Sequence, residues 1–159
     1  MADFTHEFEA TIEQLDAGGE SSPGRLFYSV VWLPERLNAD LPLKQHPRLR
    51  VDAEVDGRPH HGAFMPVRGR WYLLLSKKTL AAIRRSDGDR VHVRFRVADQ
   101  EAVDVPAELR HALEADALAQ AAWEASTAGR RRGLAYRVAS AKRAETRERR
   151  VEEVLDELR

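Results

Sequence analysis

The chain has 159 residues, no cysteine, and 26 basic against 26 acidic side chains, so its formal net charge is zero. The lack of cysteine excludes disulfide bonds, thiol nucleophiles, iron–sulfur clusters and cysteine-ligated zinc. Zero net charge argues against a general attraction to nucleic acid or to an anionic membrane, and no run of about 18 apolar residues is present that could form a membrane helix. The N-terminus has neither a basic start nor an apolar run, so it does not read as a secretory signal. We therefore expect a globular, cytoplasmic protein.

Hydrophobic and polar residues alternate over much of the first 104 residues, which is the pattern of half-buried strands. The clearest alternations are Leu49–Val55 and Val91–Val97. Residues 26–33 form a β-branched and aromatic run, which is typical of a strand buried on both faces. Gly57 follows an aspartate and predicts a hairpin after the first of these alternating strands. We expect six to seven strands that close into a small β-barrel over residues 1–104.

Two stretches of this region, residues 33–55 and 75–97, share the order strand, short helix, turn and alternating strand, with an offset of about forty residues. In the second stretch, Gly88 is expected to adopt a positive φ, and Asp89 to bond to nearby backbone donors. Identity between the stretches is slight, so chance similarity is an equally good explanation. Residues 75–93 resemble the swapped-hairpin half of AbrB/MazE-type transcription factors. That resemblance implies a double-split barrel, here with both halves in one chain.

After about residue 105 the hydrophobic period becomes 3.6 and alanine dominates, which predicts a helical region over residues 105–159. Pro106 suits the start of a helix, and a break is expected at Asp116. Residues 126–129 are expected to form a turn. The apolar residues expected on the helices are Leu109, Leu113, Ala117, Leu118, Ala121, Ala122, Trp123, Leu134, Val138, Ala141, Val151, Val154, Leu155 and Leu158. The predicted fold class is α+β, with domains at residues 1–104 and 105–159.

No residue pattern nominates a catalytic group, a metal ligand or a cofactor site. His60 and His61 are adjacent on a predicted strand and point to opposite faces, so they are poorly placed to bind one ion, and surface or turn positions are favoured for them. Asp52, Glu54 and Asp56 share one strand face, for which a solvated surface is a better explanation than paired catalytic carboxylates. Nucleophile-elbow and phosphate-loop motifs are absent. We expect no metal and no cofactor, and we favour a protein that is not an enzyme.

Aromatic residues of the predicted barrel could line a ligand pocket in its interior or at its mouth. The interior of a small barrel is normally filled by its own side chains, so core packing is the favoured explanation. The candidate pocket residues are Tyr28, Trp32, Trp71 and Tyr72.

The segment from Ser126 to Arg150 is strongly basic, with nine Lys or Arg against two Glu, and acidic residues flank it on both sides. One interpretation is a surface patch for phosphates or for an acidic partner. The favoured interpretation is a solvated helix whose charges pair locally or with the acidic flanks. Only Tyr136 is aromatic in this segment, so stacking of bases is not indicated. The candidate interaction residues are Arg130, Arg131, Arg132, Lys142, Arg143, Glu145, Thr146, Arg147 and Arg150.

Residues 140–151, with the sequence Ser-Ala-Lys-Arg-Ala-Glu-Thr-Arg-Glu-Arg-Arg-Val, resemble the C-terminal signature of the bacteriocin-protection, YdeI or OmpD-associated family. Residues 103–109 are similar to the strand-to-helix junction of that family, and residues 1 to about 100 resemble the β-barrel domain of unknown function that often precedes it. The resemblance implies stress or peptide protection and association with an outer-membrane protein, and it supplies no catalytic residues. The arginine-rich stretch Gly129–Gly133 departs from the family pattern.

Three functional hypotheses remain. The favoured one is a non-enzymatic binding or interaction protein, a monomer or weak dimer without membrane insertion, whose segment Arg130–Arg150 contacts an acidic protein surface or a phosphate-bearing ligand. Neutralising this segment would then abolish salt-sensitive partner capture and leave the thermal stability near wild type. The alternative is a small-molecule-binding barrel or an uncharacterised enzyme that uses the aromatic pocket. The least favoured is AbrB-like nucleic-acid binding by a basic face made of Lys77, Lys78, Arg84 and Arg85.

Overall fold

The computed structural model describes residues 3–16 and 27–159 and divides into two compact units. Unit 1 is Met1–Asp99 and unit 2 is Gln100–Arg159. The sequence alone predicts the boundary a few residues later, between residues 104 and 105. Unit 1 holds every strand and unit 2 holds four helices among the described residues, so the predicted α+β class is confirmed.

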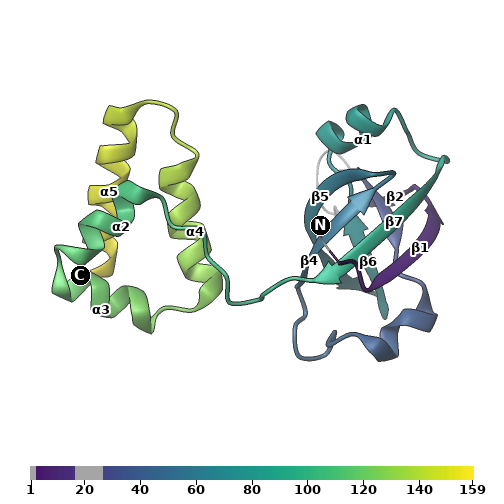
Figure 1. The fold of residues 1–159 in the computed structure, drawn as a ribbon, viewed down its shortest axis with the longest axis horizontal. Helices are drawn as coiled ribbons and strands as arrows, with labels where there is room; N and C mark the ends of the chain where they lie inside the picture. Colours follow the sequence, from purple (N-terminus) through teal and green to yellow (C-terminus); the bar gives the residue numbers. More distant parts are fainter. Residues whose placement is uncertain (1–2, 17–26) are drawn as a thin grey trace. The chain divides into compact units, whose positions relative to one another are not determined.

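Unit 1 is one antiparallel sheet of seven strands that curls into a half-barrel (Figure 1). In chain order its strands are β1 (His6–Thr11), β2 (Glu13–Asp16), β3 (Phe27–Trp32), β4 (Leu49–Val55), β5 (Arg58–Val67), β6 (Arg70–Leu74) and β7 (Arg90–Val97). The order across the sheet is β1-β7-β4-β5-β6-β3-β2. Only Ile12 separates β1 from β2, yet they pair with β7 and β3 near opposite ends of the sheet. The two edge strands, β1 and β2, do not pair with each other among the described residues, so the pairing does not close into a ring.

Two tight hairpins connect β4 to β5 and β5 to β6. The first turn is Asp56–Gly57, with φ of 46° and 80°, and the second is Arg68–Gly69, with φ of 50° and 78°. Two consecutive positive φ values are the signature of a type I′ turn, whose twist matches that of the flanking strands. The hairpin predicted from Gly57 is therefore confirmed. Gly88 also has the predicted positive φ, of 94°.

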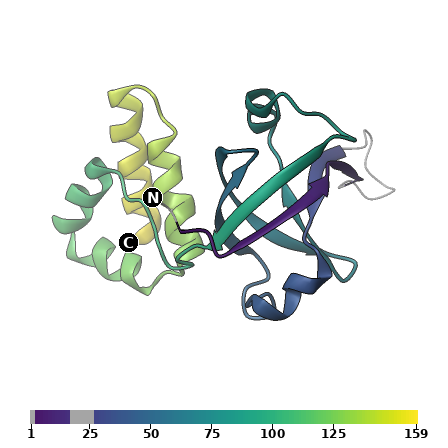
Figure 2. The same ribbon diagram turned by 45° about the vertical axis from the view of Figure 1, so that its right-hand side comes forward.

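The core of unit 1 lies on the concave side of the sheet. The inward-facing residues of β4 and β7 are those predicted by their alternation: Leu49, Val51, Ala53, Val55, Val91, Val93 and Phe95. The short helices η1 (Glu35–Asp40) and α1 (Lys77–Ile83) follow β3 and β6, in the equivalent places that the repeated pattern predicts. They lie at opposite ends of the curled sheet in both views (Figures 1 and 2).

Unit 2 packs three helices against a fourth. The helices are α2 (Ala107–Glu114), α3 (Ala117–Ala125), α4 (Ala128–Ala139) and α5 (Ala144–Leu158). Helix α2 begins after Pro106, and the side chain of Asp116 accepts a hydrogen bond of 3.1 Å from the amide of Ala119 at the start of α3. The predicted start and the predicted break are therefore confirmed. The core includes Leu109 and Val138 at 0% exposure, packed with the apolar face of α5.

Three details of the helical prediction are wrong. Leu118 is 73% exposed, and Ala117 and Ala121 are exposed as well, because α3 buries Ala119 and Trp123, which lie one turn apart on its other side. The predicted turn at residues 126–129 ends earlier, since the Thr127 hydroxyl caps α4 by accepting from the Arg130 amide at 3.2 Å. The chain also breaks between α4 and α5 at residues 140–143, inside the segment that resembles the family signature.

Candidate functional site

Two arginines of the basic segment are directed at backbone carbonyls of unit 2. Arg131 donates from Nε to the carbonyl of Trp123 at 2.9 Å and from Nη2 to that of Glu124 at 2.7 Å. These carbonyls belong to the last turn of α3, where the helix dipole favours a cation, and the carbonyl of Trp123 also accepts from the Ser126 amide at 3.1 Å. Arg132 donates from Nη1 to the carbonyl of Gln100 at 2.8 Å, on the segment that leads into α2. Both guanidinium groups thus stabilise the fold of unit 2.

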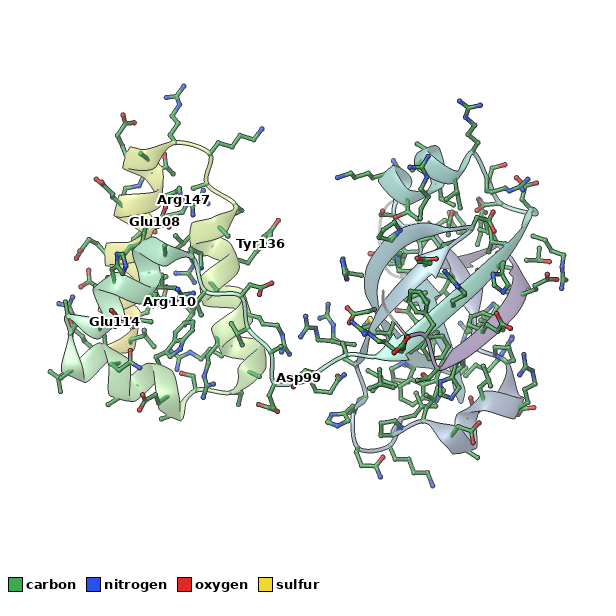
Figure 3. All side chains as sticks on the ribbon, viewed as in Figure 1. Asp99, Glu108, Arg110, Glu114, Tyr136 and Arg147 are labelled. Carbon is green, nitrogen blue, oxygen red and sulfur yellow. The ribbon has the colours of Figure 1, made fainter. Side chains whose placement is uncertain are left out.

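Arg147 joins three segments of unit 2. Its Nε and Nη2 donate to the two carboxylate oxygens of Glu108 on α2, at 2.9 and 3.0 Å, and Figure 3 shows the two side chains together. Its Nη1 donates to the carbonyls of Ala139 and Ala141 at 3.2 Å each, where α4 ends. The hydrogen bond from Arg147 holds the pKa of the Glu108 carboxyl below its usual value, and the same bond raises the pKa of Arg147.

Arg150 completes the cap on α4. Its Nη1 donates to the carbonyl of Arg137 at 2.8 Å and to the hydroxyl of Ser140 at 3.2 Å. Arg137 itself pairs with Glu157 on α5, and this hydrogen bond lowers the pKa of the Glu157 carboxyl. The two motif arginines, Arg147 and Arg150, therefore bind the C-terminal carbonyls of α4 and tie α4 to its neighbours.

The other predicted interaction residues lie toward solvent. Arg130, Lys142, Arg143 and Glu145 are exposed, and Thr146 is half-buried. Among the described residues neither Lys142 nor Arg143 has a carboxylate partner. That these residues contact a partner stays a prediction, and the surface available for it is smaller than the basic segment suggests.

The four predicted pocket aromatics do not share one face of the sheet. Trp32 on β3 lies opposite Tyr72 on β6, with ring centroids 6.1 Å apart and edge to face. The guanidinium of Arg70 lies 4.2 Å from the centroid of the Trp32 ring, in a cation–π contact. Tyr28 lies on the same side of β3 as Trp32 and is partly exposed. Trp71 is the neighbour of Tyr72 on β6, so its side chain faces the other side of the sheet, where it packs against the core.

The carboxylates on the outer face of β4 and in the turn that follows it all have basic partners. The pairs are Asp52–Arg96, Glu54–Arg94 and Asp56–Arg85. Asp56 also accepts from the backbone amide of His92 at 2.8 Å, so it holds the β4–β5 turn against β7. Among residues 3–16 and 27–159, no group of three or more acidic or histidine side chains is placed to hold a metal ion.

A cleft of about 500 Å³ lies between β5 and α1 in unit 1. The pairing of β5 with β6 covers only Phe64–Val67, because the chain beyond Leu74 turns away into α1. The strand and the helix therefore diverge and leave the cleft between them. The aliphatic part of its wall is Pro59, Ala63, Met65, Leu74 and Ala82.

His60 holds α1 beside this cleft. It is only 7% exposed, so the predicted surface or turn position is wrong for His60, although neighbouring His61 is exposed. Its Nε2 lies 3.0 Å from the carbonyl oxygen of Leu74, which can only accept, so Nε2 carries the proton. Nδ1 then accepts from the Thr79 hydroxyl at 3.0 Å, and that oxygen accepts in turn from the Ser76 hydroxyl at 3.0 Å. Burial lowers the pKa of His60 and favours this neutral ring.

Three cationic side chains, Arg48, Arg58 and Lys78, line the cleft, and no carboxylate of residues 3–16 or 27–159 lines it. None of the three has an ion-pair partner in the described part of the chain, unlike the arginines opposite the β4 carboxylates. Cations beside low-dielectric walls create a positive local potential, even in a chain of zero net charge. The hydroxyls of Ser76 and Thr79 are already engaged, since Ser76 Oγ also accepts from the Thr79 amide at 3.1 Å. The arrangement therefore suits binding of an anion better than nucleophilic chemistry.

One sequence signal could have indicated this site. His60 lies four residues before buried Phe64 in β5, on the same side of the strand, so the alternation predicts that its side chain faces inward. Gly62 lies between them, and a Cβ there would come within 3.0 Å of Leu73 Cδ1 and 3.2 Å of His60 Nε2. The lining cations come from three separate segments, and their convergence on the cleft depends on the sheet register.

No helix in the described part of the chain is long and apolar enough to cross a membrane.

Residues 102–159 match the family model described as Bacteriocin-protection, YdeI or OmpD-Associated, which confirms the resemblance seen in the motif. Residues 8–95 match the model described as Domain of unknown function (DUF1905). No curated protein matches the chain. Neither family match bears on the AbrB/MazE resemblance, which stays a prediction. Since the second model spans more than half of the chain, the protein belongs to the DUF1905 family and carries the YdeI/OmpD-associated module at its C-terminal end.

Proposed function

We propose that this protein is a non-enzymatic binding protein whose cleft between β5 and α1 holds an anionic ligand with an apolar portion. The observation that carries the proposal is a set of three cations, Arg48, Arg58 and Lys78, around an aliphatic wall, with neither an ion-pair partner nor a lining carboxylate among the described residues. Binding sites for small ligands are typically concave and mostly apolar, with a few polar groups that fix orientation, and the cleft has this composition.

The chemistry of the lining groups defines the kind of ligand. Arginine presents a planar fork of donors that matches a carboxylate or a phosphate, while lysine acts as a point charge. The aliphatic wall favours a short hydrocarbon portion, since each buried CH₂ contributes about 0.8 kcal/mol. A ligand with both parts should therefore bind more tightly than either part alone.

Hexyl phosphate, inorganic phosphate and hexanol are suitable probes, and binding is read as a rise in the melting temperature of the full chain. Hexyl phosphate is expected to raise the melting temperature of unit 1 at concentrations where phosphate and hexanol do not. The Kd for hexyl phosphate then follows from isothermal titration calorimetry.

Variants locate the binding in the cleft. Lys78→Gln is expected to weaken hexyl phosphate binding by about three- to tenfold, the range for one partly exposed charge contact. Lys77→Gln is the matched control, because Lys77 is the neighbouring exposed lysine of α1 and does not line the cleft. Equal losses for both variants, or no binding of hexyl phosphate at all, would contradict the proposal.

A second candidate function rests on the exposed cations between α4 and α5. Lys142 and Arg143 remain exposed without carboxylate partners among the described residues, close to exposed Glu145. We propose that this turn, together with Arg130, contacts an acidic protein surface. The description of the C-terminal family includes bacteriocin protection, and we propose stress or peptide protection as the context of such an interaction.

A further inference from the structure

The cations of the cleft are spread along β5. Arg58 is the first residue of β5, whereas Arg48 directly precedes Leu49, the register partner of Phe64 in β5. Arg48 is therefore level with Met65, seven residues from Arg58, which is about 23 Å of extended strand. Lys78 comes from the opposite wall of the cleft. An elongated ligand with an anionic group at each end can contact cations that a compact anion cannot reach together.

The same stretch of β5 has an open backbone edge. Residues 58–64 pair with β4 along their whole length, but the pairing with β6 begins only at Phe64. In an antiparallel pair successive residues alternate the side to which their backbone groups point. The tight β4–β5 turn makes Val55 and Arg58 a hydrogen-bonded pair, so the carbonyl of Pro59 and both the amide and the carbonyl of His61 point away from β4, toward the cleft. Among the described residues no strand pairs with that edge.

A peptide fits these features better than a nucleic acid does. An extended chain offers backbone donors and acceptors to an open strand edge, and its aliphatic side chains suit the wall formed by Ala63, Met65 and Leu74. Proteins that bind single-stranded nucleic acid combine cations with aromatic rings that stack on bases. In the described part of the chain, no aromatic side chain other than histidine lines this cleft.

We infer that the ligand of the cleft is an extended peptide segment with an acidic side chain near each end and aliphatic side chains between them, aligned along the open edge of β5. This inference rests on the proposed function, because it names the ligand class of the same site. Arg48 and Arg58 would bind the two ends, and the backbone of residues 59–61 would fix the direction of the chain.

The test uses the full chain and a seven-residue peptide, acetylated and amidated, with glutamate at both ends and alanine, valine and leucine between. Its Kd is compared with those of three relatives: a peptide with glutamate at one end only, one with lysine at both ends, and one N-methylated at alternate backbone nitrogens. Loss of one charged contact is expected to cost about tenfold. The two-ended peptide should bind about tenfold tighter than the one-ended and the N-methylated peptides, and the lysine peptide should not bind.

Arg48→Gln and Arg58→Gln should each weaken the two-ended peptide about tenfold, with Lys44→Gln as the matched control in the loop before β4. Hexyl phosphate, which is too short to contact both arginines, should lose affinity in at most one of these two variants. Equal affinity of the one-ended or N-methylated peptide, or tighter binding of a heptameric oligothymidylate, would overturn the inference. If the peptide results contradict the inference but hexyl phosphate binds to the wild-type chain, only the peptide inference fails. If hexyl phosphate does not bind either, the proposed function fails too.

Discussion

Replacement of Arg131 by glutamine gives a direct test of what the basic segment does. The sequence alone makes Arg131 a candidate for contact with an acidic partner, and its neutralisation is then expected to leave stability unchanged. The structure leads to a different expectation, because both ends of its guanidinium bind carbonyls in the last turn of α3, those of Trp123 and Glu124.

The magnitude follows from these two contacts. Hydrogen bonds from a charged donor contribute about 1.5–3 kcal/mol each when buried, but Arg131 is half-buried and water can replace part of the loss. We therefore expect Arg131→Gln to lower the free energy of unfolding by about 1–2 kcal/mol in total. For a unit of about sixty residues this corresponds to a fall in melting temperature of about 4–16 °C.

The assay is urea and thermal denaturation of the full chain, followed by circular dichroism at 222 nm, where the helices of unit 2 dominate the signal. Arg130→Gln is the matched control. Arg130 is the preceding residue on the same helix and is exposed. Its guanidinium makes one hydrogen bond among the described residues, to Ser126 Oγ at 3.5 Å, and no ion pair within 4 Å. Its replacement is expected to change the free energy of unfolding by less than about 0.5 kcal/mol.

Equal stability of Arg131→Gln and Arg130→Gln would refute the reasoning. If Arg131→Gln instead retained wild-type stability and lost capture of an acidic partner, the interpretation of the basic segment as an interaction surface would replace the capping account. Loss of stability in Arg131→Gln alone would support the internal role of this arginine.

Three further predictions concern the core of unit 2, the cleft and the exposed turn. Leu109→Ala removes a fully buried side chain and is expected to cost about 3–5 kcal/mol in urea denaturation, and a loss below 1 kcal/mol would contradict the assigned core. Burial lowers the pKa of His60, so its neutral ring contributes stability that is fully present above the ordinary value of about 6.5 and is lost as the pH falls through the lowered pKa. The melting temperature of unit 1 should therefore drop between pH 7 and 5 more in the wild type than in His60→Gln. An equal drop in both proteins would contradict the role of neutral His60 in holding α1. The double variant Lys142→Gln and Arg143→Gln should keep the wild-type melting temperature while weakening salt-sensitive capture of an acidic partner, and unchanged capture would remove the second candidate function.

Local patterns predicted the elements of this protein well where the physical signal is itself local. Gly57 predicts a hairpin because a type I′ turn needs positive φ at two successive residues, and the structure has that turn. The alternation in Leu49–Val55 and Val91–Val97 gives the inward face of the sheet directly. Pro106 and Asp116 mark two helix starts, since one lacks a donor and the other supplies a capping acceptor.

Features that depend on distant parts of the chain were not accessible in this way. Arg147 meets Glu108 across 39 residues, and nothing in the motif itself distinguishes a helix-capping arginine from a surface arginine. The cleft exists because β6 separates from β5 after Leu73, and this depends on where the chain enters α1. His60 could have been placed in the core by its parity with Phe64, but its partners Leu74 and Thr79 follow only from the fold.

The most direct test of the central claim is a ¹H–¹⁵N correlation experiment on the full chain during titration with hexyl phosphate. The account predicts concentration-dependent shifts of the backbone amides of Arg58 and His60–Ala63 in β5 and of α1, which line the cleft, with much smaller shifts in α2 to α5. Shifts centred on the α4–α5 turn, or no shifts at millimolar ligand, would contradict the claim that this cleft is the binding site.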